Sequence, residues 1–141
     1  MADFGTQRAS DWFKQLQGHL SKSAAIEFTY GGADCYEEVI GGIDLMLGTS
    51  YLADFKETYS CEKSALKAMK KAGFRSFVDY LDTFLEPVPA AFAKIGDAAV
   101  IVDNDGREHF AFCMGLHWRV KAPEGILRFG PQSVKQAFKV G

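Results

Sequence analysis

The first half of the chain carries apolar residues at the three- and four-residue intervals typical of amphipathic helices. Ser10 and Asp11 are residue types that cap helix N-termini, and they precede the first such stretch. The apolar face of this expected N-terminal helix consists of Trp12, Phe13, Leu16 and Leu20. The same intervals predict further helices over residues 35–47, 60–71 and 74–85.

The pattern changes after Pro87 and Pro89, which stop helix formation. Period-two alternation and short apolar runs then predict strands over residues 98–102, 108–114, 118–121 and 126–129. The Asp-Asn-Asp-Gly sequence of residues 103–106 favours a hairpin turn, because these residue types tolerate positive φ. A brief β-rich stretch is expected at residues 26–30 and a closing helical turn at residues 133–140. Together these elements predict an α+β fold, with N-terminal helices packed on a small antiparallel sheet.

Two adjacent glycines, Gly41 and Gly42, lie inside the expected helix 35–47. Each glycine destabilises a helix interior by about 1 kcal/mol relative to alanine. Their presence therefore predicts that another element of the fold approaches this helix closely.

Length and composition indicate one globular domain over residues 1–141. A chain of 141 residues with 48% hydrophobic and 13% aromatic residues can bury a sizeable core. Sixteen basic and 18 acidic residues give a net charge of −2, whereas a protein that binds nucleic acid by neutralising phosphates is expected to be basic. No stretch reaches about 18 consecutive apolar residues, so neither a membrane span nor a secretory signal is expected.

The chain has three cysteines and three histidines: Cys35, Cys61, Cys113, His19, His109 and His117. The odd number of cysteines, without a Cys-x-x-Cys spacing, predicts reduced thiols. The cysteines and histidines form no pairs at metal-ligand spacing, so no metal and no cofactor is predicted.

Cys35 is the cysteine whose position most clearly indicates a reactive thiol. Asp34 is placed to cap the helix that begins there, and a helix N-terminus stabilises a thiolate. A nucleophilic cysteine also needs a base. His109 begins an expected strand, and a sheet packed on the Cys35 helix could bring the imidazole and the sulfur together. From the residues alone, an isolated cysteine that packs as a small buried hydrophobe is the alternative interpretation.

Three short motifs occur in an order that resembles the NlpC-type papain-like cysteine peptidases and amidases. They are Tyr-Gly-Gly-Ala-Asp-Cys at residues 30–35, Gly-Asp at residues 96–97, and His-Phe-Ala-Phe-Cys-Met-Gly at residues 109–115. Their spacing also resembles a small phage and prophage family related to that superfamily. The resemblance implies a papain-like fold, with an NlpC-like core over residues 26–141 and an N-terminal helical extension over residues 1–25.

The resemblance also implies roles for individual residues. Cys35 would be the nucleophile that attacks an amide carbonyl, and His109 the general base that later gives the proton to the leaving amine. The superfamily usually places a third polar group, which orients the imidazole, in the region that corresponds to residues 120–122. Lys121 cannot accept a hydrogen bond when it is charged, so His117 is the alternative third residue.

The resemblance further implies a phage tail protein, located in the virion after assembly in the host cytoplasm. The expected activity is hydrolysis of a peptide amide in peptidoglycan during host-cell entry, with other tail or baseplate proteins as partners. The alternative is a catalytically inactive structural component, a tail-tip plug, hub or adaptor, which would expose a large apolar patch when isolated. A redox or ligand-binding thiol protein is a third class of function.

Overall fold

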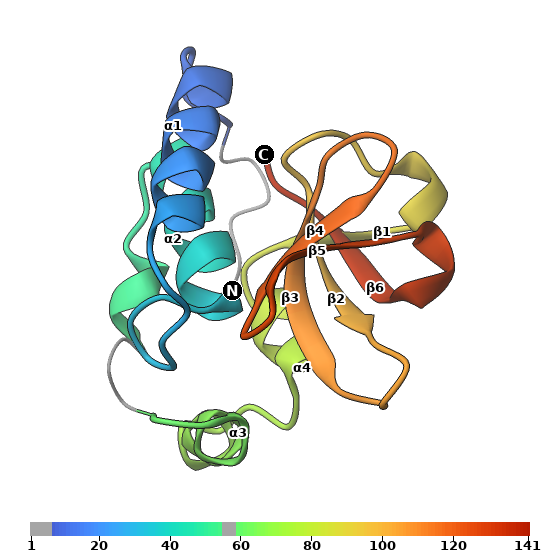
Figure 1. Ribbon diagram of the computed structural model, residues 1–141. Helices are drawn as coiled ribbons and strands as arrows, with labels where there is room; N and C mark the ends of the chain where they lie inside the picture. The colour runs from blue at the N-terminus through green and yellow to red at the C-terminus, as the bar shows by residue number, and fades with distance from the viewer. Residues whose placement is uncertain (1–6, 55–58) are drawn as a thin grey trace.

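The computed structural model describes residues 7–54 and 59–141. Within these residues the helices come first: α1 (Trp12–Ala25), α2 (Cys35–Leu47), α3 (Glu62–Lys71) and α4 (Phe77–Asp82). The strands follow: β1 (Glu86–Val88), β2 (Ala98–Val102), β3 (Glu108–Cys113), β4 (Trp118–Ala122), β5 (Gly125–Phe129) and β6 (Val134–Lys139). The predicted α+β class is confirmed. Figure 1 shows the paired helices α1 and α2 on one side of the sheet and α3 at one end of the molecule.

The six described strands form one antiparallel sheet in the order β1-β6-β2-β3-β4-β5. β2 and β3 form the predicted hairpin, in which Ile101 pairs with His109. The backbone N–H of Asp103 donates to the carbonyl of Arg107 at 2.9 Å and closes the turn. The predicted hairpin turn at residues 103–106 is therefore confirmed.

Both faces of the sheet are buried. Large side chains of β3 and β6, among them Phe110, Phe112 and Phe138, pack beneath the helices. The opposite face is filled mainly by small residues, which include Ala99, Ala111, Ala122 and Ala137. Figure 1 shows a strongly curled sheet, and small side chains on one face leave room for such a curl.

The central helix α2 packs between α1 and the sheet. Its fully buried side chains include Val39, Ile40, Ile43 and Met46. A Cβ on Gly42 would lie 2.6 Å from Cζ of Phe112 on β3, and a Cβ on Gly41 would lie 3.1 Å from Cε1 of His19 on α1. The predicted close approach is confirmed: the two glycines allow β3 and α1 to contact this helix from different sides.

The secondary structure predicted for one element was wrong. Residues 133–140, expected as a helical turn, contain the strand β6, which pairs with both β1 and β2. Phe138 belongs to the cluster beneath the helices, whereas Ala137 belongs to the cluster on the opposite face. Only Ala137 and Phe138 of β6 are buried, and Gln136 and Ala137 interrupt the polar–apolar alternation that identifies a half-buried strand.

Other expected elements are shorter in the structure. The helix expected over residues 74–85 is reduced to α4, because Ser76 caps its start and accepts the N–H of Asp79 at 3.1 Å. The β-rich stretch at residues 26–30 contributes a single bridge between residues 29 and 33.

The N-terminal helix α1 is integrated into the core. Leu16 and Leu20 are buried with the α2 side chains, whereas Phe13 of the predicted apolar face is 45% exposed. Residues 12–25 therefore pack as part of the same body as the rest of the described chain. None of the helices in the described ranges is long and apolar enough to cross a membrane.

The Gly-Asp motif at residues 96–97 anchors the start of β2. The buried Asp97 carboxylate accepts hydrogen bonds from Arg8 Nη2 at 2.9 Å, from the Val140 N–H at 3.0 Å and from the Lys94 N–H at 2.8 Å. These contacts join three separate parts of the chain. The motif thus has a structural role in this protein.

Candidate active site

Cys35 is the first residue of α2, and Asp34 caps this helix as predicted. One carboxylate oxygen of Asp34 accepts the N–H of Glu37 at 2.9 Å. The other accepts the N–H of Gly31 at 2.9 Å and the Tyr59 hydroxyl at 2.5 Å. The cap therefore fixes the position of Cys35 relative to the preceding loop and to Tyr59.

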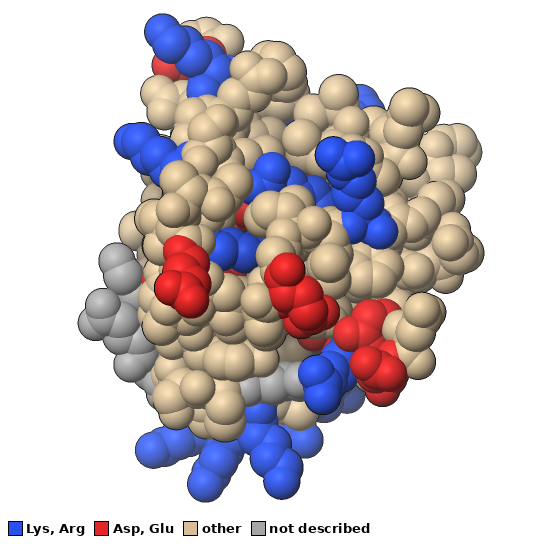
Figure 2. All heavy atoms as spheres, viewed as in Figure 1, with Lys and Arg blue, Asp and Glu red and all other residues tan. Residues whose placement is uncertain are grey.

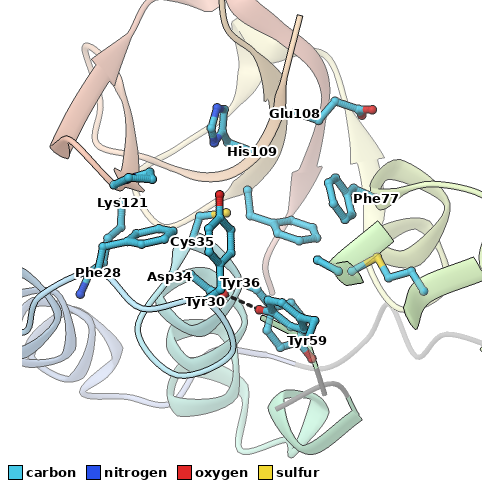
Figure 3. Close-up of a pocket in the computed structure, with 14 residues that line it drawn as sticks. Phe28, Tyr30, Asp34, Cys35, Tyr36, Tyr59, Phe77, Glu108, His109 and Lys121 are labelled. Atoms are coloured by element: carbon cyan, nitrogen blue, oxygen red, sulfur yellow. Dashed lines mark hydrogen bonds between the residues drawn. The ribbon is translucent and has the colours of Figure 1, made fainter. Parts of the chain in front are cut away.

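Cys35 and His109 line the same cavity, whose volume is about 50 Å³ (Figure 3). Its other walls are mainly apolar or aromatic and include Phe28, Tyr30, Tyr36, Tyr59, Ala65, Met69, Phe77 and Phe110. The backbone N–H groups of Phe110 and Tyr36 lie near the Cys35 sulfur, where they favour its ionised form. Because Phe110 follows His109 on β3, the sulfur lies against the strand that carries the imidazole.

Asp103 holds the imidazole of His109. Its Oδ2 lies 2.8 Å from His109 Nε2, and its Oδ1 accepts the N–H groups of Asp105 and Arg107. An ionised carboxylate only accepts hydrogen bonds, so Nε2 carries the proton and Nδ1 keeps the lone pair of the neutral ring. The ring of Phe129 stacks on the imidazole with 6.5 Å between the centroids. These contacts orient the ring and make Nδ1 its basic nitrogen.

The Asp103 carboxylate is ionised at neutral pH. Partial burial acts to raise its pKa, but the hydrogen bonds from His109 and from the N–H groups of Arg107 and Asp105 outweigh this effect and lower the pKa. A negative charge next to Nε2 favours the imidazolium that forms when the ring accepts a proton.

Sequence reasoning assigned Asp103 only to the hairpin turn. Its turn-forming residue type accounted for its presence, so no further role was predicted. The pairing of Ile101 with His109 makes Asp103 a diagonal neighbour of His109 on one face of the hairpin. This register was the signal that could have identified it.

The structure does not bring His117 to the cavity. His117 lies in the turn between β3 and β4, beyond the end of β3 that is distant from His109, and the orienting contact comes from Asp103 instead. Lys121 lines one wall, but its Nζ donates to the Ser23 carbonyl at 2.5 Å and so attaches β4 to α1. The expectation of His117 as the third residue is corrected by this geometry.

A protein-family model described as "Domain of unknown function (DUF6950)" matches residues 7–140. The chain belongs to this family. No curated protein matches the chain. The family match includes Cys35, His109 and Asp103, so the whole site lies within the family domain.

Burial raises the pKa of the Cys35 thiol to about 12, and the negative charges of Asp34 and Glu38 add to the rise. The backbone N–H groups of Phe110 and Tyr36 lower the pKa, but they do not offset this rise. The raised pKa favours a neutral thiol over the thiolate expected at a helix N-terminus, because desolvation and the charge of the capping carboxylate both oppose ionisation.

All three cysteines are free thiols, of which Cys61 is exposed and Cys113 is buried. Within residues 7–54 and 59–141, no group of three or more His, Cys, Asp or Glu side chains could hold a metal ion.

Iodoacetamide near neutral pH is expected to alkylate Cys61 before Cys35. A hydrogen bond with Ser64 lowers the pKa of the exposed Cys61 thiol, whereas a pKa of about 12 instead of 9.0 reduces the Cys35 thiolate fraction about 1000-fold. Peptide mapping by mass spectrometry over a range of pH gives the rate at each thiol, and the Cys35 rate should still rise at alkaline pH. Faster alkylation of Cys35 than of a small free thiol at acidic pH would contradict the neutral resting state.

Proposed function

We propose that the protein is a papain-like cysteine hydrolase of the NlpC type that cleaves a peptide amide bond. The observation that carries this proposal is the shared cavity of Cys35 and His109, with Asp103 on Nε2 of the imidazole. A nucleophile, a base and an orienting carboxylate are the groups that acyl transfer needs.

His109 is the proposed general base and acid. The Cys35 S–H bond breaks as the sulfur attacks the substrate carbonyl carbon, and His109 Nδ1 accepts the proton. A C–S bond forms, and the carbonyl π electron pair moves to oxygen. Collapse of this intermediate breaks the C–N bond, and His109 transfers its proton to the leaving amine. Water, deprotonated by His109, then hydrolyses the thioester and restores the thiol.

The backbone N–H of Cys35 is the candidate donor to the oxyanion. The first N–H groups of a helix have no intrahelical acceptor and point outward from its N-terminus. Because Cys35 begins α2, its own N–H lies next to the attacking sulfur. A donor in this position stabilises the negative charge that develops on the carbonyl oxygen.

The raised pKa of Cys35 makes a base essential to this mechanism. A thiol with a pKa of about 12 resembles the hydroxyl of a serine hydrolase, which reacts only as a base takes its proton. The proposed resting state of Cys35 is therefore a neutral thiol. Asp103 fixes the tautomer and stabilises the imidazolium once the proton moves.

The proposed setting is the tip or baseplate of a phage tail, where cleavage of peptidoglycan amides would help the genome to enter the host. The order of the motifs at residues 30–35, 96–97 and 109–115 supports this setting. Other tail proteins are the proposed partners, and the virion, assembled in the host cytoplasm, is the proposed location.

A catalytically inactive structural component of the tail is the second candidate function. Two observations favour it. The resting Cys35 is a neutral thiol. Large apolar side chains are also exposed, including Leu116 at 96% and Phe92 at 72%. Such exposure is expected of a subunit separated from its assembly.

Incubation of the protein with purified peptidoglycan separates the two functions. Each hydrolysed amide releases one new amine, which can be counted, and mass spectrometry identifies the fragments. Acid quenching during turnover should preserve an acyl group on the Cys35 peptide. New amines with acylated Cys35 support the hydrolase, whereas peptidoglycan that stays intact while a control endopeptidase digests it supports the structural component.

Replacement of Asp103 by alanine is expected to lower kcat by about 10²-fold with little change in KM, because the imidazole loses its orienting partner. Asp105→Ala is the matched control, since Asp105 is an exposed residue of the same turn. Steady-state kinetics and thermal melting of both variants give the comparison. Equal kcat values for the two variants would remove Asp103 from the mechanism.

A further inference from the structure

The outer face of α3 is strongly basic. Lys63, Lys67, Lys70 and Lys71 share one side of this helix and are exposed. Figure 2 shows Lys and Arg side chains gathered along the lower edge of the molecule, where α3 lies in Figure 1. The whole chain has a net charge of −2, so this lysine face is a local concentration of positive charge.

The inner face of the same helix forms part of the cavity wall. Ala65 and Met69 line the cavity beside Cys35, and Leu66 packs against the core. α3 therefore presents apolar groups to the candidate active site and lysines to the outside. A ligand bound along the lysine face would lie directly behind one wall of that site.

Among the side chains that the structure describes, no ion pair includes one of these four lysines. Lys63, Lys67 and Lys71 follow one another at four-residue intervals, and like charges at this spacing destabilise a helix. An extended anion would relieve this repulsion along the whole face.

We propose that the lysine face of α3 binds a linear polymer that carries a phosphate on each repeat, of the kind attached to bacterial cell walls. Lysine ammonium groups act as point charges toward phosphate and need no fixed planar partner. Four of them along one helix face match a flexible chain of regularly spaced anions. This inference rests on the proposed function only in its choice of a wall polymer, which would hold the hydrolase near its substrate.

The chemistry of the face favours this ligand over other anions. A membrane-surface helix exposes apolar side chains beside its cations, but Leu66 and Met69 of α3 face inward. Single-stranded nucleic acid is bound with aromatic side chains that stack on its bases, and α3 contains none. Protein interfaces are enriched in aromatic residues and arginine and depleted in lysine.

Binding of inorganic polyphosphate to the Cys35→Ala protein tests the proposal without requiring catalysis. Release of counterions from about four contacts predicts a salt slope of about −3, or about 50-fold weaker binding when salt rises from about 50 to about 200 mM. Replacing Lys63, Lys67, Lys70 and Lys71 by glutamine should abolish both the binding and its salt dependence. Replacing Lys14, Lys22, Lys94 and Lys139, which are exposed elsewhere, removes the same charge and should leave both largely intact.

A second measurement needs no lysine variant. Cys61 caps the N-terminus of α3 two residues before Lys63, so bound polyphosphate should slow its alkylation several-fold while leaving a small free thiol unaffected. This readout remains available if the fourfold lysine variant fails its thermal-melting control.

Three results would overturn the proposal. They are absence of polyphosphate binding, equal loss of binding in the two fourfold variants, and tighter binding of oligothymidine or of phosphatidylglycerol vesicles through the same lysines. The protein could also bind polyphosphate through the α3 lysines and leave peptidoglycan intact. That result would support anion binding by the lysine face and would contradict only the proposed hydrolase activity.

Discussion

Replacement of Cys35 by alanine is expected to lower kcat/KM for the proposed peptidoglycan hydrolysis by at least about 10³-fold. The variant lacks the atom proposed to form the covalent intermediate, so the proposed base His109 has no thiol proton to accept. The loss should appear in kcat, because the remaining lining of the cavity still binds substrate. Counting of new amines against time gives the rate.

Cys61→Ala and Cys113→Ala are the matched controls for the loss of one thiol. Neither residue lines the cavity, so both variants should keep the activity of the unmodified protein apart from changes in stability. Cys35→Ser provides a stricter comparison, since it retains a hydroxyl beside the base. Amine release by Cys35→Ala at the rate of the unmodified protein would exclude the cysteine mechanism.

Replacement of Glu38 by alanine is expected to lower the free energy of unfolding by about 3–5 kcal/mol, the range for breaking a buried ion pair from one side. The Glu38 side chain is fully buried on α2. It accepts from Arg119 Nη2 at 3.0 Å and from Arg119 Nε at 3.2 Å. The variant leaves the Arg119 guanidinium, 16% exposed on β4, without its carboxylate.

Urea unfolding followed by circular dichroism measures this effect. Lys135→Ala is the matched control, because Lys135 pairs with Glu108 at 3.3 Å on the surface and is 49% exposed. Removal of that pair should change the free energy of unfolding by less than about 1 kcal/mol. A change of the same small size for Glu38→Ala would show that the buried pair does not hold α2 to the sheet.

The sequence was most informative where a local signal and the tertiary packing agree. The range predicted for α2 matches the structure because Asp34 caps its start, Gly48 adopts a left-handed conformation at its end, and its apolar residues repeat at helical intervals. The β2–β3 hairpin was equally accessible from its turn residues. β6 was not, because Gln136 and Ala137 interrupt its polar–apolar alternation, and Ala137 and Phe138 enter two different apolar clusters.

The candidate site was predicted in part. Cys35 and His109 came from a resemblance together with the chemistry of their residue types, and both line the cavity. Asp103 was not predicted as a site residue, because its residue type was already explained by the turn and its role appears only once the strand register is considered. The pKa of Cys35 depends on burial and on the charges of Asp34 and Glu38, so the position of the thiol at a helix start was an insufficient guide.

The neutral state of the resting Cys35 has a consequence for durability. Peroxide and air attack the ionised form of sulfur far more readily than the protonated form. A Cys35 that keeps its proton is shielded from conversion to sulfenic and sulfinic acids. The cavity would thus retain its thiol through long exposure to oxygen.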